Sequence, residues 1–188
     1  MTSYLLAGPA GEPVSLAQAK AFLRIDDDAE DALIETLIGA ARLHVEGATG
    51  MALLVQSWRV VLDGWPDSRL VRLPVTPLFA VTGITATGDD GASHEIGLEQ
   101  FRAEADRLIV PRSVAGMPFL QERQGIEIDY VAGFGEEPED VPADLRQAVL
   151  GLVAHWHEHR DAMTAPGAGA LLPSGFDRLI AAHKRVRL

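Results

Sequence analysis

The sequence contains no cysteine, which excludes disulfide bonds, thiolate metal sites and a cysteine nucleophile. Aromatic residues are scarce, at 6% of 188 residues. No apolar run approaches the roughly 18–20 residues that span a bilayer, so we expect no membrane association. Basic residues are in the minority, because 16 lysines and arginines stand against 27 aspartates and glutamates, a net charge of −11. This excess of negative charge argues against a protein that grips nucleic acid over its whole surface.

Familiar catalytic signatures are missing as well. The chain has no G-x-S-x-G nucleophile elbow, no P-loop and no G-x-G-x-x-G after a predicted strand. The residues taken alone give no catalytic constellation. The residues by themselves therefore indicate no particular reaction.

The composition that is present is globular, with 47% hydrophobic and 23% charged residues. Apolar residues recur with a helical period over about 29–46 and 142–161, and a shorter helix is predicted over 14–25. Ser15 and Gln18 stand at capping-box spacing at the start of that shorter helix. The sequence therefore predicts helices near both ends of the chain.

Residues 52–133 consist of short β-branched runs separated by turn residues. Ile126, Ile128 and Tyr130 alternate with polar residues, which predicts a strand with one wet face. The G-D-D-G run at 88–91 predicts a hairpin turn, and the glycine- and proline-rich first dozen residues are predicted to form an arm. We expect an α+β fold: a helical bundle with a β-rich antiparallel insertion and an extended C-terminal tail.

The predicted organisation is one domain over residues 1–162, followed by a linker and docking tail over 163–188. Residues 162–188 hold four basic residues and one acidic residue, a net charge of +3, so the remaining 161 residues carry −14. The tail also carries apolar side chains, among them Phe176 and Leu179. A segment this apolar is expected to dock, and its binding surface is the chain's own core, a neighbouring copy or another protein.

Two clusters offer alternative chemistry. His155, Glu158 and His159 match H-x-x-E-H, in which two imidazoles on one helix face hold Zn²⁺ and the glutamate acts as a base. We favour the simpler interpretation of two histidines at a helix boundary beside an exposed acid. The acidic run 26–31 can hold Ca²⁺ or Mg²⁺ but lacks the spacing of an EF-hand loop. Acids at a helix start are explained by capping and the helix dipole, with Asp28 as the predicted N-cap.

The order of segments along the chain resembles a known family. The segments are V-S-L-A-Q-A-K-A-F-L-R-I-D (14–26), D-A-L-I-E-T-L-I-G-A-A-R (31–42), V-E-G-A-T-G (45–50), W-R-V-V-L-D-G-W-P (58–66), I-D-Y-V-A-G-F-G (128–135), V-P-A-D-L-R-Q-A-V-L-G-L-V-A-H-W (141–156) and L-P-S-G-F-D-R-L-I (172–180). The ordered set resembles the head–tail connector, or adaptor, proteins of long-tailed bacteriophages and of gene transfer agents, which are phage-derived particles made by some bacteria. The resemblance covers nearly the whole chain.

The resemblance implies an architectural role in the particle neck, with assembly in the bacterial cytoplasm. Connector subunits form a ring of about twelve copies beneath the portal of the capsid and join it to a stopper or another neck or tail protein. DNA passes through the ring without sequence-specific binding, and an acidic lumen would repel its phosphates and let the duplex slide. The alternatives are another neck component, such as a stopper or tail-completion protein, and, more remotely, the zinc hydrolase.

The resemblance also implies that residues 171–188 bind the portal. The predicted contact residues are Leu171, Leu172, Pro173, Phe176, Arg178, Leu179, Ile180, Lys184, Arg185, Val186, Arg187 and Leu188. The resemblance further implies a protein that is not an enzyme, with no catalytic residue, no metal ligand and no cofactor.

Overall fold

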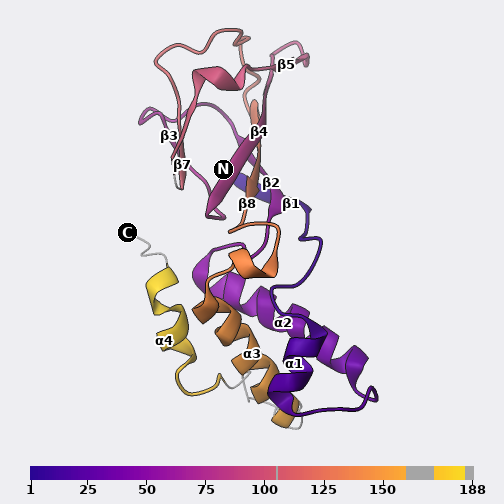
Figure 1. The fold of residues 1–188 in the computed structure, drawn as a ribbon. Helices are drawn as coiled ribbons and strands as arrows, with labels where there is room; N and C mark the ends of the chain where they lie inside the picture. The colour runs from indigo at the N-terminus through magenta and orange to yellow at the C-terminus, as the bar shows by residue number, and fades with distance from the viewer. Residues whose placement is uncertain (105, 160–171, 185–188) are drawn as a thin grey trace, which may run out of the picture. The chain divides into compact units, whose positions relative to one another are not determined.

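A computed structural model describes residues 1–104, 106–159 and 172–184 (Figure 1). Its helices and antiparallel sheets make the α+β fold that the sequence predicts. Contacts divide the chain into two compact units, each assembled from two stretches of sequence. The β unit comprises Met1–Ala10 and Val55–Phe134, and the helical unit comprises Gly11–Leu54 and Gly135–Leu188. Within the described residues, no helix is both long enough and apolar enough to cross a membrane.

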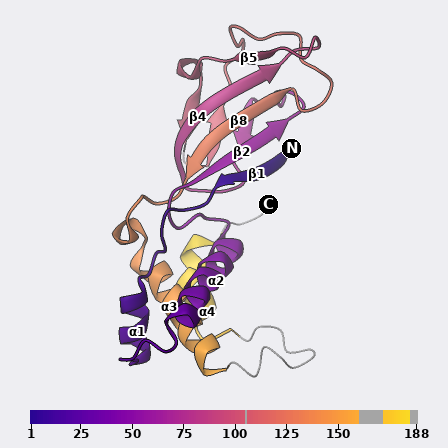
Figure 2. The same cartoon turned by 90° about the vertical axis from the view of Figure 1, so that its right-hand side faces the viewer.

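The main sheet of the β unit has five antiparallel strands in the order β1-β2-β8-β4-β5 (Figure 2). The strands are β1 (Thr2–Ala7), β2 (Gln56–Leu62), β4 (Leu78–Thr87), β5 (Ser93–Glu95) and β8 (Ile126–Ala132). Strand β8 lies at the centre, and its Ile126, Ile128 and Tyr130 are fully buried, as their alternation predicts. Strands β4 and β5 pair on either side of the G-D-D-G run, so the predicted hairpin turn is also confirmed.

A second, three-stranded sheet completes the β unit in the order β3-β7-β6. Its strands are β3 (Leu70–Arg72), β6 (Arg102–Glu104) and β7 (Arg107–Ile109), and the 3-10 helix η1 (Leu98–Gln100) precedes β6. Val71 and Leu108 are paired across this sheet and buried. The sequence gives no strand signal for β5 and β6, because their residues, S-H-E and R-A-E, are mostly polar and all exposed.

The first residues of the chain are not the arm that the sequence predicts. They form β1, an edge strand paired antiparallel with β2, with Thr2 opposite Val61 and Leu5 opposite Trp58. All its side chains except the half-buried Ser3 are exposed. The strand is held by the backbone ladder and not by burial of an alternating face, so its sequence lacks the usual strand signal.

The helical unit is built on the contact between α2 (Asp31–Thr49) and α3 (Ala143–Glu158). Helices α1 (Leu16–Leu23) and α4 (Phe176–Ile180) pack against these two helices (Figure 1). In its described residues the unit also contains the 3-10 helices η2 (Pro138–Asp140) and η4 (Ala181–His183). The buried side chains of α2 and α3 fall at helical spacing and form its core: Ile34, Leu37, Ile38, Ala41, Val45, Leu145, Ala148, Val149, Leu152, Val153 and Trp156.

The predicted capping box at the start of α1 is confirmed. The Gln18 backbone N–H donates to Ser15 Oγ at 3.2 Å, and the Ser15 N–H donates to Gln18 Oε1 at 3.0 Å. At the C-terminal end of α2, Gly50 has the left-handed φ of 74° and donates its N–H to the carbonyl oxygen of Glu46. Glycine suits this position because it adopts positive φ without a Cβ penalty.

The predicted N-cap of α2 is wrong. Glu30, not Asp28, precedes the first helical residue, and its side chain makes no capping hydrogen bond. The Asp28 carboxylate instead accepts a hydrogen bond from Lys20 of α1. A carboxylate near a helix start can either cap the helix or pair with a lysine. Asp28 pairs with a lysine because α1 places Lys20 beside it.

We expect the replacement Phe176→Ala to destabilise the helical unit by about 3 kcal/mol, because it removes a buried aromatic ring and leaves a cavity. Urea unfolding followed by the helical circular dichroism signal would measure this loss. The matched control is Leu172→Ala, whose side chain is 41% exposed and whose loss should change stability by less than about 0.5 kcal/mol. Equal effects of the two changes would contradict the assignment of Phe176 to the core.

Candidate functional site

The C-terminal segment, defined as residues 172–184, presents two different faces. Phe176 and Ile180 are buried, at 3% and 0% exposure. Leu172 is 41% exposed, and Arg178 is also exposed. Helix α4 therefore anchors the segment through one face and leaves the other open.

Contacts with α2 and α3 hold this segment in place. The ring of Phe176 lies 5.4 Å from the ring of His44 on α2, measured between centroids. His183 Nε2 donates to Asp144 Oδ2 at 2.8 Å, which joins the segment to the start of α3. The segment thus packs on the helical unit of its own chain. The chain's own core was one of the three binding surfaces that the sequence allowed for the tail.

The predicted portal contacts differ in how far they are buried, and helical spacing alone does not predict these differences. Leu171, Arg185, Val186, Arg187 and Leu188 lie outside the described residues. Leu172, Arg178 and Lys184 are exposed, Pro173 and Leu179 are half-buried, and Phe176 and Ile180 are buried. An amphipathic helix fits docking onto its own core and onto a partner equally well, so only the folded structure separates these groups.

The histidine-rich end of α3 makes internal hydrogen bonds. His157 Nε2 donates to the Glu30 carboxylate at 2.7 Å. His159 Nδ1 donates to the carbonyl oxygen of His155 at 2.9 Å, and the two imidazole rings lie 4.5 Å apart. Across residues 1–104, 106–159 and 172–184, no group of three histidine or acidic side chains is placed to hold a metal ion. This arrangement fits the helix-boundary interpretation of His155, Glu158 and His159.

The acidic run before α2 is tied to α1 by a lysine. Lys20 Nζ donates to Asp28 Oδ1 at 2.6 Å and to Asp31 Oδ1 at 2.7 Å. These hydrogen bonds, with that to Asp28 the larger cause, raise the pKa of Lys20. In return, the hydrogen bond from Lys20 lowers the pKa of Asp28 below its ordinary value of 3.8. Two carboxylates of this run therefore act as lysine partners.

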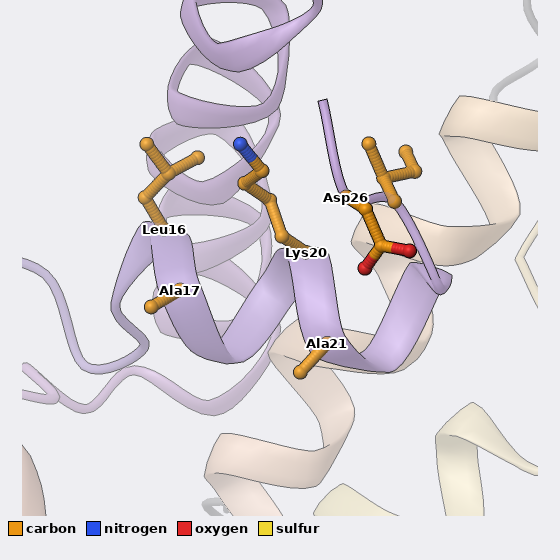
Figure 3. Close-up of a pocket in the computed structure, with 6 residues that line it drawn as sticks. Leu16, Ala17, Lys20, Ala21 and Asp26 are labelled. Carbon is orange, nitrogen blue, oxygen red and sulfur yellow. The ribbon is translucent and has the colours of Figure 1, made fainter. Parts of the chain in front are cut away.

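A shallow hollow of about 430 Å³ lies beside the same lysine (Figure 3). Leu16, Ala17, Ala21 and Asp26 line it together with Lys20, whose side chain extends from α1. Lys20 already binds two carboxylates, so this hollow has no free cation for an anionic ligand.

A second hollow, the α1–α3 groove, runs between those two helices and measures about 560 Å³. Its lining includes Val14, Gln18, Ala21, Phe22, Arg146 and Leu150. Phe22 is 45% exposed beside it. The Nε of Arg146 is buried and has no hydrogen-bond partner among the described residues. The groove therefore combines exposed apolar surface with an arginine that has no ion-pair partner among the described residues.

A model of the head completion protein family matches residues 13–172. The chain belongs to the head completion protein family. The match spans most of the helical unit and the whole stretch between α2 and α3. The connector resemblance drawn from the sequence is thereby confirmed.

Solved structures give the same result over the full length of the chain. A chain in the neck of an empty gene transfer agent particle, computed with C6 symmetry, matches with a TM-score of 0.82 and 28% identity, covering 100% of this chain and 97% of that chain. A chain in the virion of a native gene transfer agent particle matches with the same values. A chain in the neck of the native particle, computed with C12 symmetry, matches with a TM-score of 0.80, 26% identity and the same coverage. No curated protein matches.

Family membership and the neck matches support a structural component of the particle neck. Two residues that line the α1–α3 groove, Phe22 and Arg146, were not singled out by the sequence analysis. Phe22 carries a weak signal, because it is an aromatic residue in the short helix predicted over 14–25. Arg146 carries none, because its unpaired state depends on what surrounds it in the fold.

We expect Lys20→Met to raise the pKa of Asp28 toward its ordinary value of 3.8, because the change removes the hydrogen-bond donor that holds this pKa down. Carbon-13 NMR titration of the carboxyl group would measure the shift. The Lys20–Asp28 pair stabilises the fold above the ordinary pKa, and this contribution is lost as the pH falls through the lowered pKa. Lys184→Met is the control, because it removes the partner of Asp177 and should leave Asp28 unaffected.

We expect protein purified without a chelator to contain no stoichiometric zinc, as measured by elemental analysis. A zinc site needs at least three protein ligands, and the described residues bring no third ligand to His155 and His159. One zinc ion per chain, lost on replacement of His155 by alanine, would revive the hydrolase alternative.

Proposed function

We propose that this chain is a head–tail connector subunit: about twelve copies form a ring that joins the portal of a capsid to the rest of the neck and tail. The observation that carries the proposal is the match to a neck chain of a particle computed with C12 symmetry, which covers 100% of this chain. Because the match extends over the full length of the chain, it supports an architectural role for the whole chain. On this proposal the protein works by binding and turns over no substrate.

Charge supports the further proposal that DNA passes through the ring without being held. The chain has a net charge of −11, so a ring of many copies would be strongly acidic. Acidic walls repel the phosphates of a duplex and keep it sliding. Sequence-specific contacts would hinder this movement, and the proposal requires none.

The exposed side of the C-terminal segment, which includes Leu172 before α4 and Arg178 within it, is the portal-binding surface that we propose. Phe176 and Ile180 are occupied in the core of the helical unit, so they act as anchors and not as portal contacts. Leu172 and Arg178 are exposed, and one is apolar while the other is cationic. Such a surface suits a partner that offers an apolar pocket rimmed by acidic groups. A ring repeats this contact in every copy, so weak individual contacts add to strong overall binding.

We expect the double change Leu172→Asp and Arg178→Glu to weaken binding to the purified portal ring at least about tenfold, which corresponds to about 1.4 kcal/mol. Co-sedimentation of the full chain with the portal over a concentration series would measure the affinity. Both side chains are exposed, so the fold should survive, and circular dichroism would check this. Truncation before α4 would be a poorer test, because it removes the buried Phe176 and Ile180.

Leu70→Asp with Arg72→Glu is the matched control, because it makes the same chemical changes at two exposed residues of β3. This variant should bind the portal as the unchanged chain does. Equal portal binding by the unchanged chain and both variants would show that the exposed side of the C-terminal segment does not bind the portal. An unchanged chain that binds a tail protein but no intact portal would overturn the connector proposal in favour of another neck position.

A further inference from the structure

Helix α2 has an exposed face that carries almost no charge. Over residues 31–43 of α2, six residues are exposed, and they are here called the α2 face: Ala32, Leu33, Glu35, Thr36, Ala40 and Leu43. Glu35 is the single charged member, and Leu43 is 60% exposed. The solvent face of a helix is normally polar, so this composition indicates a surface that is covered when the protein assembles.

The α1–α3 groove has the complementary character. Phe22 and Leu150 supply apolar surface, and Arg146 supplies a positive charge. Arg146 forms no ion pair with any residue that the structure describes, and its buried Nε has no acceptor there. A partly buried guanidinium is stabilised by a carboxylate that can accept from it, so the groove favours an apolar partner with one acidic side chain.

The α2 face meets this requirement. It offers leucine side chains and the carboxylate of Glu35, which likewise forms no ion pair within the described residues. Its alanines and threonine are small, which lets a second helix pack closely against α2. The two surfaces of the helical unit therefore match in charge and in apolar character.

We propose that the α2 face of one copy docks into the α1–α3 groove of the next copy, where Glu35 pairs with Arg146, and that this contact closes the neck ring. The two surfaces differ, so the contact is head-to-tail, and a head-to-tail contact repeated about an axis gives a closed ring. The related necks computed with C6 and C12 symmetry have this kind of axis. The inference rests on the proposed ring function and assigns the contact that builds it.

A crosslinking experiment tests the contact directly, because the chain has no native cysteine. We expect the variant with both Phe22→Cys and Leu43→Cys to give a ladder of covalent oligomers with a short bismaleimide in the presence of the purified portal ring. Each single-cysteine variant can give dimers at most. The control pair Leu43→Cys and Leu70→Cys, which replaces a leucine of β3, should give no ladder.

The charge pair supplies a second readout. We expect Glu35→Arg and Arg146→Glu each to reduce the yield of the ladder about tenfold, and the double swap to restore it, because the attraction is re-formed with opposite signs. Arg72→Glu, at an exposed arginine of β3, is the control and should leave the ladder unchanged. Failure of the double swap to recover the yield would overturn the proposed pairing.

Portal co-sedimentation of the same samples separates this inference from the proposed function. Portal binding with no ladder from the Phe22 and Leu43 pair would overturn the contact and leave the connector function standing. A ladder without portal binding would support the contact and overturn the function. Absence of both would overturn both.

Discussion

The packing of α2 against α3 holds the helical unit together, and the other surfaces of the unit depend on it. The two helices come from Gly11–Leu54 and Gly135–Leu188, which the β stretch Val55–Phe134 separates in the chain. Neither helix can bury its apolar stripe alone. The surface under α4 and the α1–α3 groove both exist only because this long-range contact brings the two stretches together.

Helix α4 is held in place by its buried residues, and its other side remains exposed. A five-residue helix is not stable by itself in water, so it forms here because Phe176 and Ile180 are buried. Its exposed side is then held in one conformation before any partner arrives. A preformed surface binds with less loss of conformational entropy than a segment that must fold on contact. This favours α4 as a docking element even though only part of it is exposed.

The acidic charge of the chain is divided between internal pairs and unpaired groups. In the helical unit, Lys20 forms ion pairs with the carboxylates of Asp28 and Asp31. In the main sheet, Arg59 donates to both oxygens of Asp129 on the neighbouring strand, at 2.6 and 2.8 Å, and Asp129 is the first cause of the raised pKa of Arg59. Glu35 and Arg146 are not used in this way within the described residues. In the ring contact proposed above, these two charges pair between neighbouring copies.

Local features were readable from the amino-acid order, and long-range ones were not. The capping box at Ser15, the alternation ending at Tyr130 and the stripes of α2 and α3 depend on neighbours within a few residues, so their patterns are visible in one dimension. The pairing of β1 with β2 joins residues that are distant in the sequence. Asp28, which pairs with Lys20, and Phe176, which is buried, would each suit two different surroundings. Which of those surroundings each residue has is a property of packing, and packing is settled only when the whole chain folds.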